Sequence, residues 1–163
     1  MKGWIFNASP LILLGKIEQL HLIRMLSPNF RIPSPGVAEI GAGPSDDRTI
    51  MWLIQPSIAG HIVEPPQAPP FLAQWDLGAG ETAVLSLALT DNESAVVLDD
   101  LAARKFALTF DLPLLGTLGL LVRAKNAGLV AQITPHIQSL EAAGANLSIA
   151  VINRALELAN ERF

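Results

Sequence analysis

Five polar side chains spread along the chain have the chemistry of a cation site. They are an asparagine, two glutamates and two adjacent aspartates: Asn7, Glu39, Glu81, Asp99 and Asp100. Several carboxylates brought to one place repel one another unless a cation holds them together. Because all the donors are oxygen atoms, they suit a hard ion such as Mg²⁺ or Mn²⁺. Such an ion can generate hydroxide from water and stabilise charge on a phosphate under in-line attack, so these residues predict phosphoester chemistry.

These side chains can meet only if four separate segments come to one edge of the fold. Asn7 follows the apolar run 3–6, and the aspartate pair follows the apolar run 95–98. Short, continuously apolar runs favour strands of a parallel sheet that is covered on both faces. Ligands of such sheets bind beyond the carboxyl ends of the strands. Glu39 and Glu81 are expected near the starts of helices that approach the same edge.

The rest of the chain alternates strands with helices, which predicts an α/β fold with a parallel sheet and helices on both faces. Two further strands are expected at 30–33 and 113–115. Helices are expected to begin at Pro10, with Ser9 as the cap, and to follow each strand. The later helices are expected at 34–40, 46–54, 81–89, 101–108, 117–127, about 135–143 and about 148–161. Residues 64–70 hold four prolines and predict an extended loop.

Composition narrows the function classes. The 163 residues include no cysteine, which excludes disulfides, thiolate metal sites and cysteine nucleophiles. The net charge of −4 argues against a basic, charge-driven DNA-binding protein. Mean hydropathy is +0.40, yet the longest uncharged windows, 49–63 and 126–140, are shorter than the about 20 apolar residues of a spanning helix. Because the N-terminus also lacks a signal-peptide pattern, we expect a cytoplasmic domain with no membrane contact.

Several short motifs occur in an order that makes the sequence recognisable. They are Asn-Ala-Ser-Pro-Leu-Ile at 7–12, Pro-Gly-Val-Ala-Glu-Ile at 35–40, Gly-Ala-Gly-Glu-Thr-Ala at 78–83, Leu-Asp-Asp at 98–100 with Ala-Arg at 103–104, and Leu-Gly-Thr-Leu-Gly at 115–119. As an ordered set they resemble the PIN-like nuclease family, especially its prokaryotic toxin-like subgroup. The motifs span about 3–125, and the last two helices, about 135–161, are less diagnostic. Residues 1–163 are therefore expected to form a single PIN-like domain.

The resemblance implies a three-layer α/β/α sandwich and Mg²⁺- or Mn²⁺-dependent cleavage of single-stranded RNA. Many members of the subgroup are toxins held in check by a small antitoxin, and dimers are common. Matched position by position, Glu39 is similar to the family's helix glutamate and Glu81 to its third carboxylate. Asp99 or Asp100 matches the fourth, and the spacing does not decide between them. The first position departs from the pattern, because Asn7 stands where the family generally has an aspartate.

Each site residue also has a structural interpretation. Glu39 could be a solvated charge or a first-turn glutamate that complements a helix dipole, and Glu81 could be a first-turn glutamate. The aspartate pair could cap a helix, although one cap needs only one of them. Asn7 could close a turn through its side chain. The glycines of Gly-Ala-Gly at 78–80 lack the Lys-Ser/Thr that follows them in a phosphate loop, so a nucleotide site is weakly indicated.

Residues that could contact nucleic acid lie after the acidic cluster. The stretch 101–130 holds Arg104, Lys105, Arg123 and Lys125 against a single acidic residue. The first three are candidates for RNA contact, although the same pattern fits the solvated faces of two helices. Thr117 follows a strand and could touch the scissile phosphate or cap the next helix. The apolar runs 51–54 and 69–72 could serve a homodimer or antitoxin contact, or be buried in the core.

Three functional hypotheses remain open from the sequence. The first is a metal-dependent ribonuclease of the toxin type, in which Glu39, Glu81 and the aspartate pair hold the metal and act in catalysis, with Asn7 as a neutral ligand. The second is a catalytically weakened PIN-like module that binds RNA or a protein partner, since an amide brings no charge. The third is a metal-dependent phosphatase of small phosphoesters.

Overall fold

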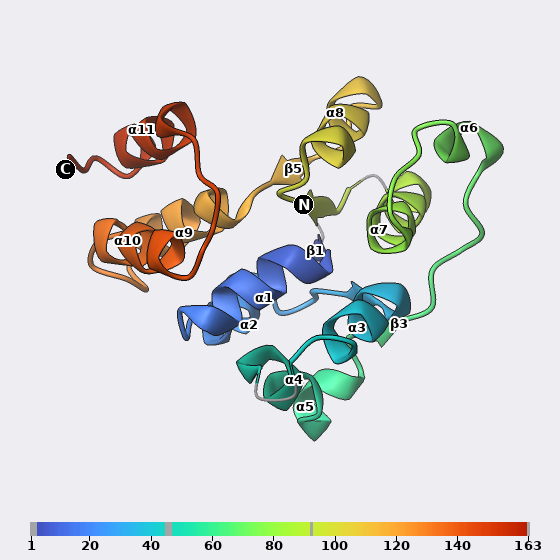
Figure 1. The fold of residues 1–163 in the computed structure, drawn as a ribbon, viewed down its shortest axis with the longest axis horizontal. Helices are drawn as coiled ribbons and strands as arrows, with labels where there is room; N and C mark the ends of the chain where they lie inside the picture. The colour runs from blue at the N-terminus through green and yellow to red at the C-terminus, as the bar shows by residue number, and fades with distance from the viewer. Residues whose placement is uncertain (1–2, 45–46, 92, 163) are drawn as a thin grey trace.

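The protein is built on a small parallel sheet that helices cover on both faces, as its computed structural model shows (Figure 1). The structure describes residues 3–44, 47–91 and 93–162. The arrangement confirms the predicted α/β class, with a three-layer order of helix, sheet and helix. The strands are short and apolar because each is enclosed from both sides, so no alternation with polar residues is needed.

Three strands form the centre of the sheet, and two more extend it. The central strands lie in the order β1 (Trp4–Phe6), β4 (Ala95–Val97) and β5 (Leu114–Leu115). A second parallel pair is formed by β2 (Ile32–Pro33) and β3 (Ile62–Val63). Backbone hydrogen bonds from Arg31 N–H to Trp4 O and from Phe6 N–H to Arg31 O join this pair to the free side of β1.

The helices connect the strands and form the outer layers. In chain order they are α1 (Ala8–Lys16), α2 (His21–Leu26), α3 (Ser34–Gly41), α4 (Arg48–Leu53), α5 (Pro56–Ala59), α6 (Pro70–Ala73), α7 (Ala79–Thr90), α8 (Leu101–Thr109), α9 (Thr117–Asn126), α10 (Thr134–Ala142) and α11 (Ile149–Leu158). Within the described ranges, none of them is both long and apolar enough to cross a membrane.

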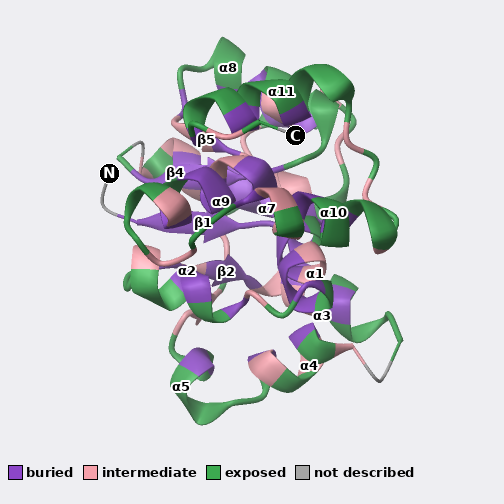
Figure 2. Cartoon of the chain, turned by 90° about the vertical axis from the view of Figure 1, so that its left-hand side faces the viewer, coloured by how far each residue is buried: buried purple, intermediate pink, exposed green. Residues whose placement is uncertain are grey.

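The two faces of the sheet pack into separate apolar clusters. Trp4 and Phe6 of β1 lie in the larger cluster, with the buried faces of α1, α2, α9, α10 and α11. Ile5, between them in sequence, points to the smaller cluster that α7 and α8 cover. Figure 2 shows β1 and β4 buried between helices whose outer sides are exposed. Side chains that alternate between two apolar layers fix the register of the strands.

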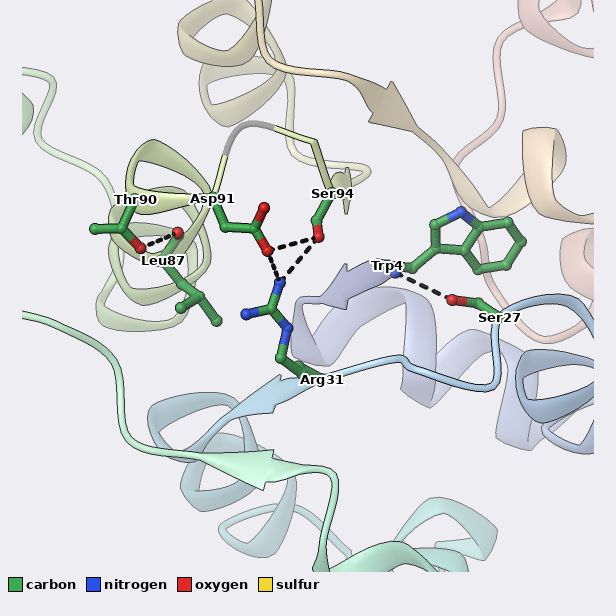
Figure 3. A network of polar contacts seen from close by, with 7 residues as sticks. All are labelled: Trp4, Ser27, Arg31, Leu87, Thr90, Asp91 and Ser94. Atoms are coloured by element: carbon green, nitrogen blue, oxygen red, sulfur yellow. Dashed lines mark hydrogen bonds and ion pairs between the residues drawn. The ribbon is translucent and has the colours of Figure 1, made fainter. Parts of the chain in front are cut away.

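A polar network at the amino ends of the strands pairs a guanidinium with a carboxylate. Arg31 Nη2 donates to Asp91 Oδ2 at 2.6 Å and to Ser94 Oγ at 2.9 Å, and Figure 3 shows Arg31 pointing between these two side chains. Burial alone would raise the pKa of Asp91, but the hydrogen bonds from Arg31 and Ser94 outweigh it and lower that pKa. The network ties the entry of β2 to the turn before β4.

A second compensated carboxylate joins the last segments of the chain, and we call this group the C-terminal clasp. Glu161 accepts from the backbone N–H of Ile133 at 2.7 Å and of Thr134 at 3.1 Å, and Lys125 Nζ lies 3.0 Å from its Oε2. Burial raises the pKa of Glu161, but these donors outweigh it and lower the pKa to about 2. The clasp therefore fixes the start of α10 against α9.

The observed elements depart from the predicted ones in a few places. Ser9 was expected to cap the first helix, but that helix begins at Ala8 and Ser9 is exposed within its first turn. The prediction missed α5, β3 and α6, which are two to four residues long. Elements this short are stabilised by their packing and carry no periodic pattern of their own. The helix predicted at 46–54 begins at Asp46, which lies outside the described residues.

Candidate functional site

The carboxyl ends of the three central strands form a single edge, which we call the carboxyl edge. Phe6 pairs with Val97 and Val97 with Leu115, so the strands end in register. Asn7, Asp99 and Thr117 come one or two residues after these ends. Two helices bring further residues to the edge, because α3 packs against α7 and carries Glu39 toward Glu81.

Asn7 is buried, and its side-chain oxygen is unsatisfied within the part of the chain that the structure describes. Its side chain is held in place because Nδ2 donates to Glu81 Oε1 at 3.1 Å. Its Oδ1 atom is buried and has no hydrogen-bond partner among the described residues. Asn7 occupies the N-cap position of α1 but makes no capping hydrogen bond through its side chain. The interpretation of Asn7 as a turn-closing residue is therefore wrong, and its carbonyl oxygen is available to a ligand.

Gly80 leaves room for two oxygen atoms to converge. A β-carbon at this position would stand 2.8 Å from Glu39 Oε2 and 2.9 Å from Asn7 Oδ1. Neither oxygen carries a hydrogen when Glu39 is ionised, so the two cannot bond to each other. We call Asn7, Glu39 and Glu81, gathered around Gly80, the Gly80 cluster. It presents oxygen lone pairs to one small space, which is the arrangement that a hard cation satisfies.

Electrostatics in the Gly80 cluster are unfavourable without a cation. Partial burial and, as a smaller effect, the nearby Glu81 carboxylate raise the pKa of Glu39. Glu81 lies in the first turn of α7, as predicted. Glu39 does not lie near a helix start, because it falls in the last turn of α3, where the helix dipole disfavours a negative charge. Its interpretation as a dipole-compensating residue is therefore wrong.

A second group of side chains surrounds Gly116, and we call Asp99, Arg104 and Thr117 the Gly116 cluster. Asp99 Oδ1 accepts from the backbone N–H of Thr117 at 2.9 Å, and Asp99 Oδ2 accepts from the Thr117 hydroxyl at 2.5 Å. A β-carbon on Gly116 would stand 2.9 Å from Arg104 Nη1 and 3.1 Å from Asp99 Oδ1. Thr117 was considered as a cap of its helix, but it is Asp99 that caps the start of α9.

The adjacent aspartates have different structural roles. Asp100 is the N-cap of α8 and its Oδ2 accepts from the backbone N–H of Ala103 at 2.9 Å. Asp99 reaches across to α9 instead. The interpretation as an N-cap is thus correct for Asp100, whereas Asp99 accepts the backbone N–H of Thr117 from outside the helix that Thr117 begins. Both residues are exposed, so each keeps lone pairs that face solvent.

The predicted basic residues do not all lie at this edge. Arg104 does, since its Nη1 donates to Leu98 O at 2.8 Å where β4 ends. Lys105 is exposed on the outer side of α8. Arg123 instead lines a cavity of about 210 Å³ with Gly3, Trp4 and Ser27, residues at the start of β1 and beyond α2. Arg123 is therefore separated from the Gly116 cluster.

Four of the five predicted site residues fall into the two clusters, and the fifth, Asp100, caps α8. In the part of the chain that the structure describes, no set of three or more histidine or acidic side chains is close enough to hold a metal ion. Asn7 is not an acid, and it is the residue that completes the Gly80 cluster. The sequence pointed to the right edge but not to this division, nor to Gly80 and Gly116, whose missing β-carbons make room for the side chains.

Comparison with known families decides the relationship. A family model described as a PIN domain matches residues 3–161. The chain belongs to the PIN-domain family. No curated protein and no solved structure matches it at a level that would show a relationship. The family match covers both clusters of the carboxyl edge and the helices that follow them.

The residues of this PIN domain fit the divalent metal that PIN domains generally use. The buried, unsatisfied Asn7 Oδ1 and the Glu39 and Glu81 carboxylates form an all-oxygen donor set. Mg²⁺ and Mn²⁺ prefer such donors, and two carboxylates are the usual protein contribution to a magnesium site. A cation among them would also offset the repulsion between the Glu39 and Glu81 carboxylates.

Proposed function

We propose that this PIN domain is an endoribonuclease that uses Mg²⁺ or Mn²⁺ to hydrolyse phosphodiester bonds in single-stranded RNA. The observation that carries the proposal is the convergence of Asn7 Oδ1 and Glu39 Oε2 on the space beside Gly80, where Asn7 Oδ1 has no hydrogen-bond partner among the described residues. Family membership supports nuclease chemistry. The RNA substrate is inferred from the resemblance to toxin-like family members.

Each residue of the two clusters would have a separate role in the reaction. Glu39, Glu81 and Asn7 hold the ion, and Asp99, fixed by Thr117, borders the reacting phosphate. When bound, the ion lowers the pKa of water and stabilises negative charge on the phosphate. In the reaction, water oxygen bonds to phosphorus and one P–O ester bond breaks, leaving a terminal phosphate and a hydroxyl. Asp100 would contribute indirectly, because it caps α8 and thereby orients Asp99, the residue before it.

Cleavage of a single-stranded RNA oligonucleotide tests the proposal. We expect cleavage with Mn²⁺ or Mg²⁺, and its loss when EDTA removes the metal. In Glu39→Gln we expect cleavage to fall by more than about 100-fold, the largest loss usually seen when a residue that only supports a metal ligand is changed. Glu141→Gln is the matched control, because Glu141 is an exposed glutamate on α10. Cleavage that survives EDTA would contradict the proposal. A nucleoside monophosphate offered in parallel separates a nuclease from a phosphatase.

The neutral Asn7 favours one alternative, a catalytically weakened module that binds RNA or protein. An amide oxygen binds a divalent ion less tightly than a carboxylate does, because it adds no charge. Asn7→Asp separates the two functions by the size of the gain in cleavage. A large gain would identify the natural protein as the weakened module, whereas a small gain would support an active nuclease.

We propose that the protein is a cytoplasmic toxin held in check by a small antitoxin. We also propose that it forms a homodimer. The resemblance to toxin-like PIN domains supports the first point. Exposed apolar side chains on α4 and at its end, Met51 at 58% and Ile54 at 68% exposure, offer surface for a second copy. Growth arrest on expression tests the toxin role, and light scattering of Ile54→Glu tests the dimer.

A further inference from the structure

The two clusters of the carboxyl edge differ in how their charges are balanced. In the Gly80 cluster, the buried Oδ1 atom of Asn7 has no hydrogen-bond partner among the described residues, and it converges with Glu39 Oε2 on the space beside Gly80. In the Gly116 cluster, both oxygens of Asp99 already accept hydrogen bonds from Thr117. A cation would therefore supply the partner that Asn7 Oδ1 lacks in the Gly80 cluster. In the Gly116 cluster, protein donors already bond to the carboxylate of Asp99.

Arg104 supplies a fixed positive charge to the Gly116 cluster. Its guanidinium is half-buried and held by the carbonyl of Leu98, 2.8 Å from Nη1. Among the described residues no carboxylate forms an ion pair with Arg104, in contrast to Arg31, Arg48 and Arg154. A guanidinium has five N–H donors, and its planar fork matches the oxygens of a phosphate. Arg104 therefore has donors left for an anion.

We propose that the edge holds one divalent cation, in the Gly80 cluster, and that Arg104 takes the place of a second cation by binding a phosphate oxygen of the RNA. This inference rests on the proposed nuclease function. A phosphate lying across the edge would meet the cation on one side and the Arg104 fork on the other. Two positive groups placed on opposite sides of a phosphate stabilise the charge that develops during its hydrolysis.

Arg104 is distinguished in this role from the other basic residues of the same stretch. Lys105 is its neighbour in sequence but is exposed on the outer side of α8. Arg123 lines a cavity with Gly3 and Trp4, at the other end of β1. Lys105→Gln is therefore a matched control for Arg104→Gln, because both remove one positive charge from α8 and only one of them acts at the edge.

The first experiment counts metal ions and does not depend on activity. The protein is titrated with Mn²⁺, and binding is measured by calorimetry and by the EPR signal of free Mn²⁺. We expect one site per chain. Arg104→Gln is expected to bind Mn²⁺ with unchanged affinity, and Glu81→Gln to lose the site. Two sites of comparable affinity would overturn the inference while leaving the nuclease proposal intact. No bound Mn²⁺ would overturn the nuclease proposal itself.

The second experiment measures RNA affinity. Fluorescence anisotropy of a labelled single-stranded RNA, with Ca²⁺ replacing Mn²⁺, is expected to show about 10–100-fold weaker binding for Arg104→Gln, as for loss of a hydrogen bond to a charged group. Lys105→Gln is expected to change binding less than about threefold. Equal losses in the two variants would overturn a specific role for Arg104.

A conservative variant covers the case in which Arg104→Gln does not fold because Leu98 O loses its donor. Arg104→Lys keeps the charge but lacks the planar fork, so it is expected to bind RNA with an intermediate affinity. Thermal melting followed by circular dichroism identifies the folded variants. Wild-type RNA affinity in a folded Arg104→Lys would overturn the role of the fork.

Discussion

The Gly80 cluster and the C-terminal clasp both centre on glutamates, yet the protein treats these acids in opposite ways. In the clasp, Glu161 accepts backbone hydrogen bonds and an ion pair, and its pKa falls to about 2. In the Gly80 cluster, partial burial and, to a smaller extent, the Glu81 carboxylate raise the pKa of Glu39. The contrast shows that the fold can neutralise a carboxylate where it serves stability, so the unbalanced acids at the edge indicate a site for a ligand.

The largest expected effect comes from filling the space beside Gly80. In Gly80→Ala the new β-carbon would meet oxygens of Glu39 and Asn7 at 2.8 and 2.9 Å. We expect at least about 100-fold loss of Mn²⁺ affinity and of RNA cleavage. The metal-free protein should lose about 1–3 kcal/mol of stability from the clash with the buried Asn7 side chain, partly offset because alanine favours a helix by about 0.5–1 kcal/mol over glycine. Mn²⁺ calorimetry and thermal melting measure the two effects.

Gly41→Ala is the control for this change. Gly41 is also helical, and a β-carbon there would meet nothing within 4 Å. It should leave Mn²⁺ affinity and cleavage unchanged. An equal loss of metal binding in both variants would show that the space beside Gly80 is not the seat of the ion.

The second prediction breaks the clasp. Glu161→Gln removes the charge that faces Lys125, whose side chain is only 22% exposed. We expect the free energy of unfolding to fall by about 2–4 kcal/mol at neutral pH, because a partly buried ammonium loses its partner. Mn²⁺ affinity should be unchanged, since the clasp lies outside the edge. Urea unfolding with and without Mn²⁺ checks both statements.

The clasp also predicts a pH dependence with a definite sign. The pKa of Glu161 is depressed in the folded protein, so its contribution is complete above the ordinary value of 4.5. That contribution is lost as the pH falls toward the folded value of about 2. The stability difference between wild type and Glu161→Gln should therefore shrink between these two pH values, and a difference that stays constant would contradict the assignment.

The third prediction makes the Gly80 cluster more acidic. Asn7→Asp places a third negative charge at a position that is 1% exposed. It also replaces the hydrogen bond from Asn7 to Glu81 by repulsion. In EDTA we expect the free energy of unfolding to fall by about 1–3 kcal/mol. Because a carboxylate binds a divalent ion more tightly than an amide, Mn²⁺ should restore more stability to the variant than to the wild type, as thermal melting would show.

The smallest expected effect has the opposite sign. The raised pKa of Glu39 means that the unfolded chain ionises more readily, so this residue lowers stability as the pH rises above its ordinary pKa of 4.5. Glu39→Gln should therefore raise the melting temperature in EDTA at neutral pH. Glu39 is exposed, so the gain should stay below about 1 kcal/mol. In Mn²⁺ the order of the two proteins should reverse.

The sequence predicts the scaffold well because its strands are distinctive. The continuously apolar runs around Ile5 and Val96 indicate buried parallel strands, and both are present at the expected places. The carboxyl edge follows from that topology. Elements such as β3 are not predictable in this way, because two residues carry no periodicity.

The internal arrangement of the site is beyond sequence reasoning, because it depends on contacts between distant segments. The aspartate pair illustrates this, since Asp100 caps the local helix whereas Asp99 reaches Thr117 across the sheet. The expected position of Glu39 near a helix start was wrong for a different reason, because the predicted helix over 34–40 already places residue 39 near its end. The start of α3 at Ser34 leaves Glu39 in its last turn, and the contact between α3 and α7 brings it to the edge.

The larger apolar cluster has a consequence for the order in which the chain is synthesised. It contains Trp4 at one end of the sequence and Ala159 at the other, so it is complete only when α11 has been made. Every side chain of the carboxyl edge lies within the first 117 residues. Before α11 emerges, a chain still attached to the ribosome contains all the residues of the carboxyl edge. It lacks the complete apolar cluster that holds these residues in their relative positions. Metal binding should therefore appear only after synthesis has passed α11.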